Sequence, residues 1–481
     1  MRIFDTKVQY LKYKVLREVA RHAWSDTLLH AVADIPGEIA PGPKSTMYCC
    51  VYKERAILSE RVRIAMGGKK DLANVIEVID IACDECPASG FEVTNACRGC
   101  LAHRCEDVCP RDAISYDEHQ KAHIDKDKCI GCGMCARVCP YSAITKNKRP
   151  CENACKVGAI RMSRDSETKE AVIDEGKCIS CGACVYQCPF GAITDKSYIL
   201  EVIRMLRQSV EQNGPRVYAI VAPSISGQFR YAKLGQVVSG IRALGFAGVM
   251  EVALGADLVA KEEAAEWAEK KFLTTSCCPA FVEYIKKQFP AMAEHISTNP
   301  SPMARIAQLI KEREPEAKVV FIGPCTAKKM EVRREEVRPY VDSAITFEEL
   351  QALFASRDLD IPAMEEMALE NASYFGRIFA RSGGVSAAVQ EAIVEQGMEG
   401  SEFRPLACDG IEECRTALLK ASKGILPENF IEGMACMGGC ISGAGCLTHG
   451  AKNKMEVDKY SRASSKKTIA EAVQHCADER K

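Results

Sequence analysis

The second half of the chain alternates short apolar runs with amphipathic segments. Apolar, β-branched runs that end in Gly, Pro or Cys predict strands. They occupy residues 216–223, 247–254, 318–325 and 403–410. Segments between them, such as 237–246 and 302–314, have the apolar spacing of helices. Strands that alternate with helices predict a parallel sheet, in which ligands bind beyond the carboxyl ends of the strands.

The first eighty residues form a different, mainly helical segment. Residues 8–24 and 59–68 have helical spacing, and the Pro/Gly-rich stretch 34–45 predicts a loop between them. This segment could cover the next module or form an oligomer contact, and the sequence does not distinguish the two. Charges every few residues at the start argue against a secretory signal. No apolar run approaches the ~18 residues of a membrane span, so we expect a cytoplasmic protein.

Composition narrows the possible functions. The 481 residues include 64 Lys and Arg against 65 Asp and Glu, a net charge of −1. A balanced charge gives no reason to expect a nucleic-acid or membrane-surface binder. The 27 cysteines are more informative, because thiols in a reducing cytosol more often bind metal or do redox chemistry than form disulfides.

The cysteines are concentrated in an internal repeat. Sixteen of the 27 lie between Cys83 and Cys188, and the next 88 residues contain none. Four similar segments cover residues 97–114, 129–144, 151–160 and 178–193. Two copies have the spacing C-x2-C-x2-C-x3-C-P, one has four residues before its third Cys, and one keeps only the last pair. This spacing predicts an α+β ferredoxin-like module with several 4Fe-4S clusters over residues 81–195.

The spacing also predicts how the cysteines group. In two-cluster modules the Cys before Pro binds the neighbouring cluster. One cluster would use Cys97, Cys100, Cys105 and Cys139. A second would use Cys129, Cys132, Cys135 and Cys109, and a third would use Cys178, Cys181, Cys184 and Cys155.

Four cysteines of this region remain after three clusters are assigned. They are Cys83, Cys86, Cys151 and Cys188. Their number is compatible with a fourth cluster, but Cys83 and Cys86 could equally be partly buried free thiols or zinc ligands. Zinc is not expected in the repeats themselves, because zinc sites seldom have this clustered spacing.

Three loops carry the chemistry of residues 196–481. They are TSCCPAF (275–281), IGPCTAKKME (322–331) and GMACMGGCISGAGC (433–446). Gly permits close backbone approach to a bulky ligand, and helix N-termini direct N–H groups at an anion. Any one of these cysteines alone would more often be a buried small hydrophobe. Together they predict a further iron-sulfur site, held by Cys278, Cys325, Cys436 and Cys440.

These loops resemble the three signature motifs of the iron-only (FeFe) hydrogenases. TSCCP, PCTxKxxE and MACxGGCxxG occur in order from Thr275 to Gly443. The resemblance includes the ferredoxin-like half and the run CCVYKERAI…RIAMGG (49–68), and it is to the monomeric clostridial-type group B branch. It implies an α/β catalytic domain of two lobes, each a parallel sheet flanked by helices, with the cluster in the cleft between them.

The resemblance also implies the cofactor. This is the H-cluster, a 4Fe-4S cubane joined through one cysteine sulfur to a diiron unit with CO, cyanide and a bridging dithiolate. Cys278, Cys325 and Cys436 match the cubane ligands, and Cys440 matches the shared thiolate. Lys328 matches the donor to a cyanide, although a solvated surface lysine is the alternative. Met434 matches a residue beside the diiron unit. Ala222, Pro223 and Ser224 match the segment near a second cyanide.

A proton path is implied in the same way. Cys277, next to Cys278, is available as a proton carrier, since a thiol can exchange a proton near neutral pH. In the family the path continues through a glutamate, a serine and a second glutamate, which match Glu263, Ser297 and Glu266. The alternative is an amphipathic helix with solvated acids and a capping serine.

The sequence departs from the best-known members around this site. The differing positions are Ala280, Phe281, Met303, Gly323 and the run Ala444-Gly445-Cys446-Leu447. Cys446 could be a pocket thiol, but we favour a packed core cysteine. We expect five others to be structural or free: Cys49, Cys50, Cys408, Cys414 and Cys476.

The predicted function is reversible H2 oxidation and proton reduction, with a ferredoxin as electron carrier and hydrogenase maturation proteins as partners. No Gly-rich dinucleotide fingerprint follows a strand, which argues against direct NAD use, although a partner subunit could supply another acceptor. The alternatives are a slow hydrogen sensor and a non-enzymatic iron-sulfur assembly protein. Retention of Cys277 argues against the sensor, and Lys328 with a complete third loop argues against the assembly protein.

Overall fold

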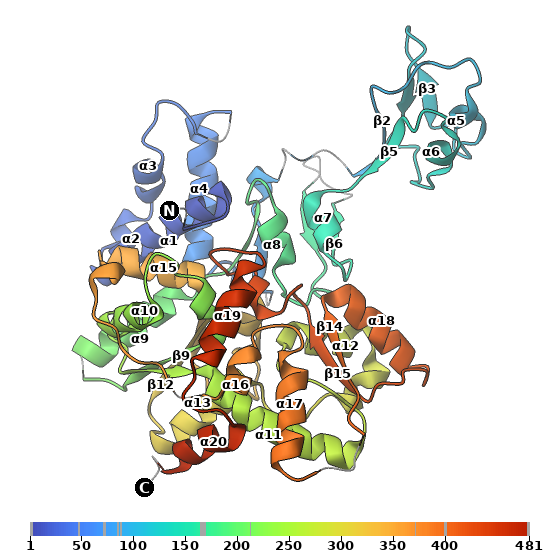
Figure 1. Ribbon diagram of the computed structural model, residues 1–481. Coiled ribbons are helices and arrows are strands. Elements are labelled where there is room, and N and C mark those ends of the chain that lie inside the picture. The colour runs from blue at the N-terminus through green and yellow to red at the C-terminus, as the bar shows by residue number, and fades with distance from the viewer. Residues whose placement is uncertain are drawn as a thin grey trace.

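The structure is a computed structural model that describes residues 3–46, 49–70, 74–83, 86, 89–163, 170–211, 213–370, 372–398 and 402–478. The side chain of Cys476 lies outside this description. None of the helices in these ranges has the length and apolar character that a membrane span requires. Figure 1 shows a large body with a small domain that stands apart from it.

The N-terminal segment consists of α1 (Lys7–Trp24), α2 (Leu28–Ala31), α3 (Ile35–Ile39) and α4 (Val51–Ala65). The predicted helices are confirmed, but the loop predicted over 34–45 is partly wrong. Pro36 occupies the first turn of α3, where its missing N–H costs nothing, and Ile35 beside it is buried. The apolar face of α1 shares one hydrophobic core with the body, against α9 and α15. The segment therefore covers part of the body.

The larger lobe is a parallel sheet in the order β10-β9-β12-β13. Its strands are β9 (Val217–Val221), β10 (Gly248–Glu251), β12 (Lys318–Gly323) and β13 (Ser343–Thr346). Its helices include α9 (Ile199–Glu211), α10 (Leu234–Ala243), α13 (Pro302–Arg313), α14 (Thr326–Glu331) and α15 (Phe347–Ser356). Successive strands run to opposite sides of the β9–β12 pair, so the segments after β9 and β12 lie at a topological switch point, where α/β sheets bind ligands.

The smaller lobe is a parallel sheet in the order β11-β15-β14. Its strands are β11 (Leu273–Thr274), β14 (Pro405–Asp409) and β15 (Phe430–Met434). One face packs on α11 (Val252–Lys270) and α17 (Gly384–Glu395), and the other on α12 (Pro279–Gln288) and α18 (Ile411–Ala421). The predicted two-lobed α/β fold is confirmed. The remaining elements are η2 (Pro223–Gly227), η3 (Pro290–His295), η4 (Ile361–Ala363), α16 (Tyr374–Ile378), η5 (Cys440–Ser442), α19 (Lys452–Arg462) and α20 (Ile469–Asp478).

One strand prediction fails in part. The run 247–254 is a strand only to Glu251, because Val252 begins the long helix α11. This helix is rich in Ala and Leu, which favour helix over strand. It packs on α13 of the larger lobe and on α17 of the smaller one, and so joins the two lobes.

The cysteine-rich part folds as two small α+β modules. The first contains β2 (Gly90–Val93), α5 (Arg104–Asp107), β3 (Ile114–Tyr116), β4 (Ala122–Ile124), α6 (Met134–Val138) and β5 (Ile144–Asn147). The second contains β1 (Ile76–Val78), η1 (Asp80–Ala82), α7 (Pro150–Ala154), β6 (Ile160–Met162), β7 (Ala171–Ile173), α8 (Ala183–Gln187) and β8 (Ile193–Asp195). The first module stands apart from the body in Figure 1, while α8 of the second lies against it.

The boundary predicted at residue 80 does not match this arrangement. β1 pairs antiparallel with β8, so the second module begins before residue 80. A buried ion network ties this module to the body. Lys12 of α1 contacts Asp195 of β8 at 2.5 Å and Glu348 of α15 at 2.7 Å. Lys329 of α14 contacts the same Asp195 at 2.8 Å.

Candidate active site and cluster sites

A cavity of about 640 Å³ lies between the two lobes, at the carboxyl ends of their strands. From the smaller lobe, Cys278 follows β11 and caps α12, and Cys440 begins η5 after β15. From the larger lobe, Cys325 follows β12 and caps α14. Ala222 and Pro223 line the cavity after β9. The prediction that these segments meet beyond the strand ends is confirmed.

The four cysteines of the three loops lie together. Cys278, Cys325 and Cys440 line the cavity. Cys436 lies beside them. Its pKa is raised well above the usual range, first by burial and then by the nearby thiols of Cys325, Cys181, Cys278 and Cys440. Burial, followed by Cys325 and Cys278, raises the pKa of Cys440 to about 12. Within the described ranges, no three His, Cys, Asp or Glu side chains are arranged to hold a single metal ion.

The residues around this cavity fit an anionic, bulky cofactor. The Oγ atom of Ser224 is buried and has no hydrogen-bond partner, as expected of a donor that awaits a ligand. Gly439 has φ +87°, and a Cβ atom there would meet the backbone nitrogen of Ser382 at 2.7 Å. The third loop therefore requires Gly at this position, where it passes close to neighbouring backbone.

Lys328 projects into this apolar surface. Among the described residues that line the cavity, it alone carries a full charge. Its Nζ atom donates to Ser301 Oγ at 3.0 Å and lies 2.6 Å from Glu331. The residue is only 8% exposed, so the alternative of a solvated surface lysine is wrong. Met434 and Cys277 line the same cavity.

The residues of the predicted proton path lie near one another as a chain of polar side chains. Glu263 of α11 is fully buried, and burial raises its pKa to about 8. Its Oε1 accepts from the backbone N–H of Ser276 at 3.4 Å, while Oε2 has no partner. Ser297 lies beside Glu263 and donates to Glu266 Oε2 at 2.7 Å. The alternative of solvated acids is wrong for Glu263.

Glu266 marks the outer end of this chain. Burial acts to raise its pKa, but hydrogen bonds from Lys270, Thr298 and Ser297 together lower it. Lys270 lies 2.7 Å away on the next helical turn. The chain thus runs from a fully buried acid to a half-buried, ionised one. At its inner end the partly buried Cys277 lies near Glu263, and desolvation followed by the Glu263 charge raises the pKa of the Cys277 thiol.

The departures from the family pattern lie in and beside the cavity. Met303 lines it, whereas Phe281 packs on Gly433, where a Cβ atom would meet its ring at 2.3 Å. Cys446 is fully buried with its Sγ 3.5 Å from the Ile441 carbonyl oxygen, so it is a packed core cysteine. Cys408 and Cys414 are also buried, while Cys49 and Cys50 are exposed.

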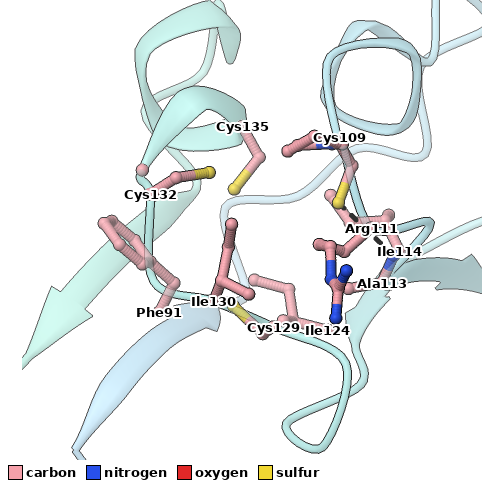
Figure 2. A pocket seen from close by; sticks show the side chains of 12 residues that line it. Phe91, Cys109, Arg111, Ala113, Ile114, Ile124, Cys129, Ile130, Cys132 and Cys135 are labelled. Atoms are coloured by element: carbon pink, nitrogen blue, oxygen red, sulfur yellow. Dashed lines mark hydrogen bonds between the residues drawn. The ribbon is translucent and has the colours of Figure 1, made fainter.

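In the first module, four cysteines predicted to share a cluster line one cavity of about 340 Å³. They are Cys109, Cys129, Cys132 and Cys135. Figure 2 shows the sulfur atoms of Cys109, Cys132 and Cys135 around a common space. Of the other predicted set, Cys97 and Cys105 pack on the same hydrophobic core. Cys100 and Cys105 lie near Tyr116, and the Ala143 N–H donates to Cys139 Sγ at 3.4 Å.

In the second module, Cys184 is surrounded by the thiols predicted to join it. Burial, then Cys181, Cys178 and Cys155, raise its pKa well above the usual range. Cys181 in turn lies near Cys278 and Cys436 of the body. This set of cysteines therefore lies next to the four-thiol site. Cys83, Cys151 and Cys188 form another buried group, in which burial and the other two thiols raise the pKa of Cys151 to about 12.

Several contacting residues were not predicted. Ser301 and Glu331 hold Lys328 in place. Glu331 ends the PCTxKxxE motif, three residues after Lys328, and this helical spacing was a usable signal. Thr298 and Asn299 donate hydrogen bonds to the carboxylate of Glu266. They lie beyond Ser297 in a loop, and no sequence pattern distinguishes them.

Comparisons with known proteins show the family of the chain. The model of the iron only hydrogenase large subunit, C-terminal domain, matches residues 215–444. The 4Fe-4S dicluster domain matches residues 96–143 and 149–192. The chain is 30% identical to iron hydrogenase 1 of Clostridium pasteurianum over 415 residues, which covers 74% of this chain and 70% of that protein. The chain belongs to the iron-only hydrogenase family.

Three further similarities are informative. The periplasmic [Fe] hydrogenase large subunit of Nitratidesulfovibrio vulgaris is 29% identical over 391 residues, covering 70% of this chain and 88% of that protein. A solved [FeFe]-hydrogenase, studied for oxygen inactivation of its H cluster, has a TM-score of 0.50 at 20% identity, over 58% of this chain and 93% of the other. The cytosolic Fe-S cluster assembly factor NAR1 of Kluyveromyces lactis is 35% identical over 88 residues, covering 18% of this chain and 19% of that protein.

Proposed function

We propose that the protein is an FeFe hydrogenase that interconverts H2 with protons and electrons at an H-cluster between the two lobes. The observation that supports this most strongly is the meeting of four thiols from three distant loops at an apolar cavity with one buried ammonium. Each feature suits an anionic iron cofactor, and together they distinguish this site from an ordinary cysteine-containing core.

Each residue has a defined part in this proposal. Cys278, Cys325 and Cys436 would hold the cubane, and Cys440 would supply the fourth thiolate. Lys328 donates to one anionic cyanide by a charge-assisted hydrogen bond, held in place by Ser301 and Glu331. Ser224, with its buried and unpartnered Oγ, and the cavity-lining Ala222 and Pro223 would bind the second cyanide, and Met434 would pack against the cofactor. When bound, the cofactor supplies the reversible two-electron chemistry of H2.

Protons travel along Cys277, Glu263, Ser297 and Glu266. A proton carrier works best when its pKa lies near the operating pH, and the pKa of Glu263 is about 8. Glu263 is therefore mostly protonated at neutral pH and can pass a proton inward while Ser297 reorients to supply another. Glu266, near the surface, exchanges protons with solvent.

Electrons enter and leave through the ferredoxin-like modules. The proposed ligand sets hold three accessory 4Fe-4S clusters, of which the one at Cys178, Cys181, Cys184 and Cys155 lies beside the cubane site. A soluble ferredoxin is the proposed external carrier, in the cytoplasm, and hydrogenase maturation proteins supply the diiron unit.

A non-enzymatic role in iron-sulfur assembly is the second candidate, favoured by the local similarity to NAR1. The test is the chain purified without oxygen after co-expression with hydrogenase maturation proteins, and the same chain without them as control. The hydrogenase proposal expects infrared bands of CO and cyanide, with H2 uptake and evolution, only in the matured sample. A sample loaded with iron and sulfide but free of these bands supports the assembly role. The bands with trace turnover support a sensor.

A further inference from the structure

The second ferredoxin-like module is built from two separate stretches of chain. β1 precedes the first module and pairs antiparallel with β8, which follows it. The first module closes in the same way, since β2 pairs antiparallel with β5. Equivalent hydrogen bonds extend both pairs: the Ile79 N–H donates to the Ala192 oxygen, and the Thr94 N–H to the Ala143 oxygen, both at 2.7 Å. The first module is therefore inserted into the second.

Because of this insertion, the eight cysteines of the second module do not form one continuous motif in the sequence. When residues 87–150 are set aside, the second module has the cysteine spacing of the first at every step except two, the one between its second and third cysteines and the one between its fourth and fifth. Cys83 and Cys86 then match Cys97 and Cys100. Cys151 matches Cys105, and Cys188 matches Cys139. The helices that carry the third and seventh cysteines pack together in both modules, α5 on α6 and α7 on α8.

Backbone N–H groups point at the cysteine sulfurs in both modules. In each module the fourth and the eighth cysteine accept a hydrogen bond at sulfur from the backbone N–H of the residue four positions later, at 3.2 to 3.4 Å. The pairs are Ala113 with Cys109, Ala143 with Cys139, Ala159 with Cys155, and Ala192 with Cys188. Figure 2 shows the first of them. The Ala171 N–H also donates to Cys83 Sγ at 3.4 Å. Such bonds are a known means of tuning iron-sulfur clusters.

We propose that Cys83, Cys86, Cys151 and Cys188 hold a fourth accessory 4Fe-4S cluster, and that Arg149 sets its reduction potential. Cys83, Cys151 and Cys188 are 5 to 7% exposed and share one hydrophobic core. Arg149 connects the fourth ligand to them: its Nη1 donates to Cys83 Sγ at 3.5 Å and its Nη2 to the Cys86 carbonyl oxygen at 3.1 Å.

Arg149 is a positioning residue with an electrostatic effect. It is only 3% exposed, so solvent screens its charge weakly. Reduction adds one electron to the cluster and breaks no bond, and a nearby cation and its N–H donors stabilise the added negative charge. Arg149 therefore raises the potential of this cluster.

The position of the site suits a role in electron transfer. This role rests on the proposed function, but the existence of the fourth cluster does not depend on it. The chain leaves the second module after Cys86 and returns at Arg149, whose N–H donates to Ser89 Oγ at 3.3 Å. The fourth cluster thus lies where the first module joins the rest of the protein. It connects the two clusters of the first module with the cluster beside the active site.

The test uses the full chain, expressed without maturation proteins and purified without oxygen, so that its result does not depend on H2 chemistry. Cys83→Ala and Cys188→Ala are compared with Cys49→Ala, which changes an exposed thiol outside the motif. Iron, sulfide and zinc are counted, and the clusters are titrated by electron paramagnetic resonance. We expect the first two variants to lose about four irons and four sulfides per chain, with one titrating signal. Iron content equal to that of Cys49→Ala, or a zinc ion lost instead, would overturn the proposal.

Arg149→Gln keeps the proposal testable if the cysteine variants do not fold. We expect this variant to retain its full iron content and to shift a single cluster to lower potential, with Arg149→Lys in between. An unchanged titration in Arg149→Gln overturns the assignment of Arg149 and of the site it contacts.

Discussion

Thr326 donates its hydroxyl to the carbonyl oxygen of Ser180 at 2.7 Å. Thr326 follows Cys325 of the catalytic domain, and Ser180 precedes Cys181 of the second module, so one buried hydrogen bond joins two cluster sites. Gly182 makes the contact tight. Its φ is +77°, and a Cβ atom there would meet Ala444 at 2.5 Å and Thr326 Oγ1 at 2.6 Å. The module is thus fixed on the body at the place where the proposed function requires electron transfer between them.

The first prediction concerns this contact. Thr326→Val keeps the shape of the side chain but leaves the buried Ser180 carbonyl without its donor, which should lower the free energy of unfolding by about 1–3 kcal/mol. It should also slow reduction of the accessory clusters by H2, measured by stopped-flow absorbance. Thr326→Ser keeps the hydroxyl and serves as the control. Equal behaviour of the two variants would show that the hydrogen bond has no such role.

The second prediction concerns the proton path. Cys277→Ser and Glu263→Gln should leave the iron content and the infrared bands intact but reduce H2 turnover by orders of magnitude, because each removes a proton carrier. Glu262→Gln is the matched control, since Glu262 lies on the same helix but pairs with Arg305 at 2.9 Å. Turnover at the wild-type rate in both path variants would eliminate the relay.

The third prediction uses the pKa of Glu263, which rises from 4.5 to about 8 on folding because the carboxyl is buried. An acid with a raised pKa binds its proton more tightly when folded, so its contribution to stability is complete below pH 4.5 and is lost as the pH rises through 8. Wild type should therefore lose up to about 4 kcal/mol more stability than Glu263→Gln between pH 5 and pH 9. Denaturant unfolding at both pH values measures the difference. Parallel pH profiles would mean that Glu263 is not protonated in the folded protein.

The sequence predicted the local features of the site well. Apolar runs and short-range spacing predict the strand ends and the three loops. They also predict the positions of Cys278, Cys325 and Cys440. The start of a helix at Val252 could not be predicted in this way, because an apolar run of four residues cannot be assigned to strand or helix without its tertiary contacts. Buried partners such as Ser301 are also invisible in the sequence, since they depend on contacts between distant elements.

The cysteine grouping shows the same limit in another form. Spacing within one continuous stretch predicted three ligand sets. The fourth was left open because Cys86 and Cys151 are separated by an inserted module. Only the pairing of β1 with β8 shows that these stretches belong to one fold. Long-range pairing of this kind leaves no local signal.

The fourth prediction concerns Lys328. Lys328→Met keeps the length of the side chain and removes the charge that we propose to bind a cyanide. The cubane should still assemble, because all four thiols remain, but the infrared bands of CO and cyanide should be strongly reduced in the matured protein. Lys329→Met is not a suitable control, since Lys329 belongs to the ion network with Asp195. Lys328→Arg keeps a cation and should retain part of the bands. CO and cyanide bands of full intensity in Lys328→Met would show that Lys328 does not bind a cyanide.

The last prediction concerns the inserted module. Its two connections lie side by side, with Ser89 and Arg149 in contact and β2 paired with β5. Deleting residues 90–147 and joining Ser89 to Lys148 should therefore leave the second module and the body folded, with about eight fewer irons. The shortened protein should still oxidise H2 with a small dye as acceptor but lose most of its rate with ferredoxin. Deletion of residues 76–147, which also removes β1 and the Cys83–Cys86 pair, is the control, and it should lose the second module as well. A 90–147 deletion that unfolds the body, or that keeps its full rate with ferredoxin, would show that the first module is neither an independent insertion nor the site of electron entry.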